Sequence, residues 1–355
     1  MIIEFSVWGP DFDHKAIYDR LVASLDVTEV ILYHQQEWEY ITFPYFDQVA
    51  ELCFFRRIPF KIIICTSAFV KPVHDVRNLK YSRVTIINWG TFWISDYMFN
   101  ASAPWQTGYL RGQPDKYLYP FVSMNAKPHM HRCLMIDLLA SRNLIDVGAV
   151  SWLEITNVDD TSQFGGILPS VFRGYQYKYW TPEIMRLSEP QQSGEFSNYY
   201  SQPEEYFHSF MQLIAESQAS TQQMMSEKTF MPLFHRKPFL VLAATGHYAL
   251  FTDYGFKLYD EIFDYSFDSE PDIEKRANMI IDNVEKIRNY SQDEFKSLYQ
   301  TLMPKLEYNY NLAVHLATDI NQVPKIILDA CLDPTKVSCS PSLVNFIKQY
   351  NSHVK

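Results

Sequence analysis

The chain has 355 residues, 47% of them hydrophobic and 20% charged, which is enough for two ordinary domains and excludes a disordered polypeptide. A formal net charge of −10 disfavours a broad nucleic-acid-binding surface, although a local basic cleft would not show in the total. The five cysteines are odd in number and form no Cys-x-x-Cys pair. The sequence therefore predicts neither a disulfide framework nor a zinc site, and it favours a reducing cytoplasm.

The first third of the chain alternates the patterns of strands and helices. Strands are expected at 1–8, 29–33, 61–66 and 83–89, and helices at 13–25 and 45–54. Such alternation is typical of an α/β domain with a mainly parallel sheet. We place this domain at 1–120, with a linker at 101–116, where prolines and glycines interrupt the apolar periodicity.

The same alternation returns in the second part of the chain. Strands are expected at 117–124, 149–155, 210–215 and 239–244, and helices from Pro128, after Ser226, at 274–288 and at 293–318. The apolar run 239–244, flanked by Pro238 and Gly246, predicts an interior parallel strand. We place a second domain at 121–330 and a C-terminal helical tail at 331–355, with a helix that begins at Ser340.

The stretch 209–256 predicts strand, loop, helix, strand and loop in succession. Ser226 is expected to cap the helix, and Arg236 and Lys237 are expected in its last turn, where cations suit the helix dipole. Lys228 and the backbone amides of the first turn suit a phosphate, and Glu227 suits ribose hydroxyls.

Two further residues of this stretch leave alternatives open. Glu216 follows the first strand and either caps the amides of the loop or contacts a bound sugar. Gly246 follows the second strand at its carboxyl end, where α/β sheets place ligands. It belongs either to the wall of a nucleotide site or to a plain turn.

Residues 125–132, NAKPHMHR, form a second candidate site between a strand and a helix. Four of their side chains are basic, and cations at a helix N-terminus oppose the helix dipole unless an anion is bound there. We therefore interpret this junction as an anion site, formed by Asn125, Lys127, His129, His131 and Arg132.

Glu216-Ser217, a loop, Ser226-Glu227-Lys228, a helix and an apolar strand together resemble the donor-site segment of the fucosyltransferase-like GT-B glycosyltransferases. That segment reads roughly Phe-Glu-Asn-Ser, loop, Thr-Glu-Lys, so Ser217 and Ser226 stand where the family has Asn and Thr. The resemblance extends to viral and bacterial relatives and covers mainly 121–265. It implies an α/β fold with two Rossmann-like domains in a GT-B arrangement.

The same resemblance implies a function. The chain is expected to move a sugar from a nucleoside-diphosphate donor, with a GDP-sugar favoured, to a glycan or another hydroxyl acceptor. Arg132 matches an arginine that binds the donor diphosphate in the family, and a bidentate guanidinium suits that role. No tightly bound cofactor is expected. The absence of a signal-peptide pattern or a run of about 20 apolar residues favours a soluble, cytoplasmic protein of a bacterium or a virus-infected cell.

In the resembled family, the general base comes from the N-terminal domain, and no motif selects it here. The candidates are carboxylates or histidines able to reach an acceptor hydroxyl, namely Glu37, Glu39, Asp96, Asp13, Asp11 and His14. Asp11-Phe12-Asp13 spells the Asp-x-Asp metal motif of the other main glycosyltransferase fold. That fold would not place the motif so near the N-terminus, so we assign no metal.

Two alternatives to this function remain. One is a catalytically inactive nucleotide- or sugar-binding protein, which the missing base motif supports. The other is a glycosyltransferase that acts on modified DNA bases, which the acidic net charge disfavours. A donor-hydrolysis assay tests the first, and salt-dependent DNA binding tests the second.

Overall fold

In a computed structural model, the chain forms two compact units, the first of residues 1–100 with 314–355 and the second of residues 101–313. The structure describes residues 1–6, 14–34, 46–64, 84–90, 94, 114–126, 128–153, 175–181, 183–188, 202–216, 219, 225–322 and 325. Residues 101–113 of the linker expected at 101–116, and the helix expected from Ser340, lie outside these residues.

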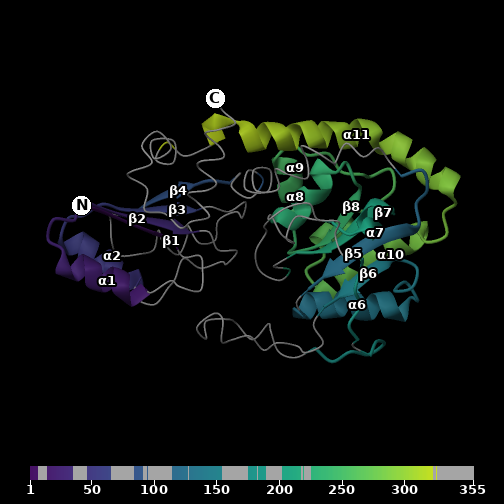
Figure 1. Cartoon of the computed structure of the whole chain (residues 1–355), viewed down its shortest axis with the longest axis horizontal. Helices are drawn as coiled ribbons and strands as arrows, with labels where there is room; N and C mark the ends of the chain where they lie inside the picture. Colours follow the sequence, from purple (N-terminus) through teal and green to yellow (C-terminus); the bar gives the residue numbers. More distant parts are fainter. Residues whose placement is uncertain are drawn as a thin grey trace. The chain divides into compact units, whose positions relative to one another are not determined.

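The first unit contains a parallel sheet in the order β1-β2-β3-β4. Its elements are β1 (Ile2–Ser6), α1 (His14–Ala23), β2 (Glu29–His34), α2 (Phe46–Phe55), β3 (Phe60–Ile64) and β4 (Val84–Asn88), close to the predicted bounds. The two described crossovers run in the same direction, so the right-handed rule places α1 and α2 on one face of the sheet. The two helices contact each other there (Figure 1).

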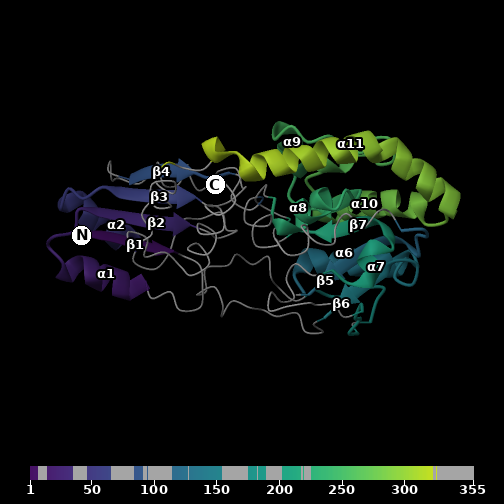
Figure 2. The same ribbon diagram turned by 45° about the horizontal axis from the view of Figure 1, so that its top comes forward.

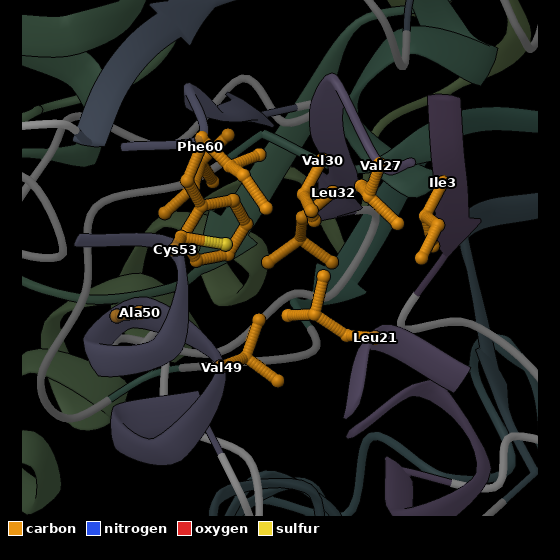
Figure 3. Packing of buried hydrophobic residues seen from close by; sticks show 11 residues of the cluster. Ile3, Leu21, Val27, Val30, Leu32, Val49, Ala50, Cys53 and Phe60 are labelled. Atoms are coloured by element: carbon orange, nitrogen blue, oxygen red, sulfur yellow. The ribbon is translucent and has the colours of Figure 1, made fainter. Parts of the chain in front are cut away.

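The core of this unit lies between the sheet and the two helices (Figure 3). Leu21 of α1 and Val49 of α2 are fully buried against Val30 and Leu32 of β2. The apolar periodicity of the two helices and the runs of branched residues in the strands therefore form one cluster, as the sequence predicts.

The second unit contains a parallel sheet in the order β6-β5-β7-β8. Its strands are β5 (Tyr119–Asn125), β6 (Ala149–Trp152), β7 (Ser209–Ala215) and β8 (Phe239–Leu242). Helix α6 (Met130–Ser141) leads from β5 outward to β6, and α8 (Glu227–Phe234) leads from β7 outward to β8 on the other side. The strand order thus reverses between β5 and β7. Because both crossovers are right-handed, α6 and α8 pack on opposite faces.

The remaining described helices follow β6 or β8. They are α7 (Glu204–Phe207), α9 (His247–Asp253), the 3₁₀ helix η2 (Ser266–Ser269), α10 (Ile273–Ile287), α11 (Gln292–Thr318) and the 3₁₀ helix η3 (Ile320–Gln322). A capping box begins α11, since Ser291 N donates to Glu294 Oε2 at 2.6 Å and Glu294 N donates to Ser291 Oγ at 3.3 Å. Helix α11 is long and continuous (Figure 2). None of the described helices is long and apolar enough to cross a membrane.

The boundaries of the compact units differ from those expected from the sequence at 120/121 and 330/331. Tyr117 precedes the expected boundary but is buried in the second unit, where its ring packs on Phe210 and Phe295. At the other end, helix α11 continues past residue 313, and its last residues group with the first unit. A linker rich in turn residues therefore marks the boundary only approximately.

The prediction that 239–244 is an interior strand is wrong in its position but correct in its burial. β8 is the last strand of the described sheet, yet all four of its residues are buried. Tyr248 of α9 covers the open edge, because its hydroxyl accepts a hydrogen bond from Val241 N at 2.8 Å. The segment after β8, expected as a loop, contains α9.

Two local predictions around helix ends are corrected. Helix α8 ends at Phe234, so Arg236 and Lys237 follow the helix and do not lie in its last turn. Lys237 instead turns inward and donates to Ser209 O at the start of β7. Helix α6 begins at Met130 with His129 as N-cap, so Pro128 precedes the first turn.

Candidate functional site

The carboxyl edge of the second sheet brings the predicted residues together. Asn125 ends β5 and is in register with Trp152, while Ala215 at the end of β7 is in register with Leu242. Connections leave β5 and β7 in opposite directions, and in open parallel sheets this arrangement as a rule forms a crevice outside the carboxyl ends of the strands. Ligands of open parallel sheets bind at such a switch point.

Helix α6 begins at this crevice with an uncapped and basic first turn. Its N-cap residue, His129, makes no side-chain capping bond, and the first turn contains no acidic residue. His131 and Arg132 follow in the first turn and are buried. Cations at the positive end of a helix are stabilised by an anion. Lys127, predicted for the same site, lies outside the described residues.

His131 joins α6 to the end of β7. Its Nε2 lies 2.6 Å from the carbonyl oxygen of Glu216. A carbonyl oxygen only accepts, so Nε2 carries the proton and Nδ1 keeps its lone pair. Burial, followed by the charge of Arg132 and other nearby cations including Lys228, lowers the pKa of His131 well below its usual value. The imidazole is therefore neutral, and α6 and α8 present cations to the same region.

Glu216 binds the start of α8. Its buried carboxylate accepts from Ser226 N at 2.7 Å, from Ser226 Oγ at 2.5 Å and from Thr229 Oγ1 at 2.9 Å. These contacts close the loop between β7 and α8 at its two ends. Ser226 Oγ in turn accepts from Lys228 N at 3.3 Å, which confirms Ser226 as the N-cap.

Glu227 and Lys228 form an ion pair at the N-terminus of α8. Lys228 Nζ lies 2.6 Å from Glu227 Oε1, and the two side chains are 28% and 9% exposed. The ammonium group is thus partly accessible to a ligand, while the carboxylate is held nearly buried beside it. The local sequence places both groups at the helix start because Ser226 fixes where α8 begins.

Asn125 contributes a buried polar group with one unsatisfied atom. Its Nδ2 donates to Ser123 Oγ at 3.1 Å, and its backbone N donates to Ser151 Oγ at 3.1 Å. Its Oδ1 has no hydrogen-bond partner among the described residues, although the residue is only 2% exposed. A buried acceptor without a partner is costly, so a donor from a bound ligand would be stabilised there.

Gly246 adopts the left-handed conformation, with φ of 79°, and begins α9. The first-turn amides of that helix are already occupied, since Tyr248 N and Ala249 N donate to the Asp268 carboxylate at 2.9 and 3.0 Å. The N-terminus of α9 is therefore saturated by the protein. Gly246 remains a predicted wall residue.

The structure adds Arg276, which the sequence analysis missed. This side chain of α10 is 2% exposed, and it donates to Thr245 Oγ1 at 3.1 Å, to Ala219 O at 2.8 Å and to Glu270 O. Its position inside an ordinary helical pattern gave no local signal, because Ala219 and Thr245 are distant in sequence.

The candidate bases are not placed by the described structure. Glu37, Glu39, Asp96, Asp13 and Asp11 lie outside the described residues, as does the side chain of His14. Within the part of the chain that the structure describes, no group of three or more His, Cys, Asp or Glu residues is arranged to hold a metal ion.

Comparisons with known proteins give one structural neighbour. No protein-family model matches the chain, and no curated protein matches its sequence. The structure is similar to that of a mutant of T4 phage BGT in complex with UDP-glucose, with a TM-score of 0.42 and 11% sequence identity over 90% of this chain and 82% of that chain. The function is therefore argued from the residues of the site.

Proposed function

We propose that the chain is a glycosyltransferase whose second unit binds a nucleoside-diphosphate sugar at the carboxyl edge of its sheet. The observation that carries the proposal is the basic first turn of α6, which has no acidic residue and no side-chain cap, at the point where the strand order reverses. The two features together favour a phosphorylated ligand. The two units then correspond to a GT-B arrangement, with the acceptor hydroxyl, on a glycan or another molecule, held by the first unit.

The charges of the site suit the chemistry of the transfer. When the bond between the sugar and the diphosphate breaks, negative charge builds on the departing diphosphate. Arg132 and Lys228 are the cations able to neutralise it, which is electrostatic stabilisation of the transition state. The neutral His131 holds α6 against β7 through its bond to Glu216 O and keeps these cations close together.

Binding of nucleotides to the purified protein tests this proposal. UDP, GDP and dTDP are compared with CMP by thermal shift and calorimetric titration, and the favoured donor nucleotide is GDP. A true ligand stabilises the fold by about 2.7 kcal/mol at a hundredfold excess over its Kd. Arg132→Ala and Lys228→Ala are each expected to weaken diphosphate binding by about 1.5–3 kcal/mol, the scale of a charge-assisted hydrogen bond.

Arg142→Ala is the matched control. Arg142 follows the opposite end of α6 and pairs with Asp282 and Glu285 at 3.0 and 2.6 Å, so its loss changes charge without touching the crevice. Diphosphate binding that is unchanged in both Arg132→Ala and Lys228→Ala, with their circular dichroism intact, would overturn the proposed site. Tight DNA binding with a steep salt dependence would instead favour a modified-base acceptor.

A further inference from the structure

We infer that Arg276 is a positioning residue that shapes the nucleoside half of the donor site, an inference that rests on the proposed function. Its guanidinium joins three segments that are far apart in sequence. They are the loop after β7, through Ala219 O, the loop after β8, through Thr245 Oγ1, and the segment before α10, through Glu270 O. Both loops leave the carboxyl edge of the sheet.

A structural purpose alone explains this arrangement poorly. A buried guanidinium is costly because it stays charged and must satisfy five N–H donors. None of the described contacts pairs Arg276 with a carboxylate at ion-pair distance, and its Nε has no partner among the described residues. The planar fork is instead used to hold neutral oxygens at fixed mutual positions, which a flexible ammonium could not do.

Asp268 complements Arg276 from the same connecting segment. Asp268 O accepts from Gly246 N at 2.9 Å, and its carboxylate caps the amides of Tyr248 and Ala249. The segment from η2 to the first turn of α10 therefore braces the carboxyl edge of the sheet. Asp268 binds the loop after β8, and Arg276 binds the loops after β7 and β8.

The position of the brace indicates which part of the ligand it affects. Neighbouring strands lie about 4.8 Å apart, so the loops after β7 and β8 begin about one and two strand spacings from the end of β5. A diphosphate at the first turn of α6 leaves the nucleoside to extend over these loops, on the side where Glu227 and Lys228 lie. Arg276 thus fixes the surface under the nucleoside and does not contact the phosphates.

This assignment predicts a loss that depends on the ligand. Arg276→Met is expected to weaken binding of UDP and GDP by about tenfold, equivalent to one charged hydrogen bond, and to leave inorganic pyrophosphate within about twofold of wild type. Arg276→Lys keeps the charge but lacks the planar fork of the guanidinium. Its affinity for UDP and GDP should lie between the affinities of wild type and Arg276→Met. Affinities are measured by calorimetric titration well below the melting temperature of each variant.

Arg288→Met is the matched control. Arg288 caps the other end of α10 and likewise donates to backbone carbonyls, to Arg142 O at 3.1 Å and Asn143 O at 3.5 Å. It should lower stability without changing either affinity. If Arg276→Met does not fold, Thr245→Val removes one acceptor of the brace at nearly constant volume and should show the same selective loss.

The outcomes separate this inference from the proposed function. Equal weakening for nucleoside diphosphates and pyrophosphate, or no weakening for either, overturns the role of Arg276 while the donor site stands. Wild-type protein that binds neither ligand overturns the proposed function, and the inference with it.

Discussion

Glu227 and Lys228 are adjacent residues of opposite charge, and the structure suggests separate tasks for them. The side chain of Lys228 is 28% exposed and its charge acts on His131, whereas the side chain of Glu227 is 9% exposed. Glu227 is therefore the better candidate for a directed hydrogen bond from a ribose hydroxyl. Near neutral pH the carboxylate accepts such a bond with its charge, which makes the bond stronger than one to an amide.

Glu227→Gln tests the ribose role. The variant should bind UDP or GDP more weakly, and should discriminate less than wild type between each ribonucleotide and its 2′-deoxy or 3′-deoxy analogue. Calorimetric titration with the paired ligands measures this discrimination directly. Equal losses for the ribo and deoxy ligands would assign Glu227 to the helix instead, where removing a charge from the first turn costs about 0.3–1 kcal/mol of stability.

Lys237 gives a prediction on the pH dependence of stability. It is buried beside Tyr206, with Nζ 4.9 Å from the ring centroid, and burial lowers its pKa from 10.5 to about 7. Between these values the unfolded chain binds a proton that the folded protein does not, so this lysine makes the free energy of unfolding rise with pH from 7 to 10.5. The destabilisation that it causes is largest below pH 7.

Lys237→Met removes this proton linkage. Wild type should gain stability relative to the variant by up to about 1.4 kcal/mol per pH unit between pH 7 and 9.5. Urea unfolding of both proteins at several pH values measures the difference, in which other titrating groups cancel. Parallel stability profiles would show that Lys237 is protonated in the fold.

The residues that the sequence identified correctly are those with local causes. Ser226 caps α8 because a short hydroxyl reaches the amide two residues on, and that geometry is contained in the sequence. Arg276 and Lys237 were missed or misplaced because their partners are distant. Lys237 after a helix suggests a dipole interaction, but burial against Ser209 and Tyr206 determines its place.

Among the elements, α6 has a second role besides carrying the basic turn. Asp137 in its middle is 1% exposed and accepts four hydrogen bonds, from Tyr175 Oη and from the backbone amides of Lys178, Tyr179 and Trp180, at 2.8–3.1 Å. This carboxylate anchors the aromatic segment 175–180.

Asp137→Asn should release that segment. The amide has one acceptor oxygen and places an N–H₂ group against backbone donors, so we expect a loss of about 2–3 kcal/mol of stability. Hydrogen exchange of the amides at 178–180 should speed up, and trypsin should cut after Lys178. Asp282→Asn, at an exposed ion pair of α10, is the control and should change stability by at most about 1 kcal/mol. Unchanged exchange at 178–180 would contradict the anchoring role.

The parallel α/β character of both sheets could be predicted, since alternating strand and helix patterns are periodic along the chain. The order of the strands could not. The reversal between β5 and β7 depends on which strands pair across long connections, and the sequence fixes no register between them. The switch point, and hence the meeting of α6 with the end of β7, emerged only from the structure.

For the whole molecule, the proposed function divides the work between the two units. The proposed donor site lies in the second unit, with Arg132 and Lys228 as its cations. The general base is expected from the first, where the candidates are Glu37, Glu39, Asp96 and Asp13. A base acts on the acceptor hydroxyl and not on the nucleotide, so loss of the base should lower transfer and leave donor binding unchanged.

Amide substitution at each of these four candidates tests that division. The variant of the true base should lose about 10²–10⁴-fold in transfer rate, the usual contribution of a positioned base, while its affinity for the donor nucleotide stays at the wild-type value. Arg132→Ala should instead lose donor affinity as well as transfer rate, because Arg132 is proposed to bind the diphosphate and to stabilise the charge that builds on it. Nucleotide titration and a donor-consumption assay on the same preparations measure both quantities. If all four variants transfer at the wild-type rate, the base is none of them. If wild type binds the donor but neither transfers nor hydrolyses it, the chain is a binding protein whose first unit supplies no base.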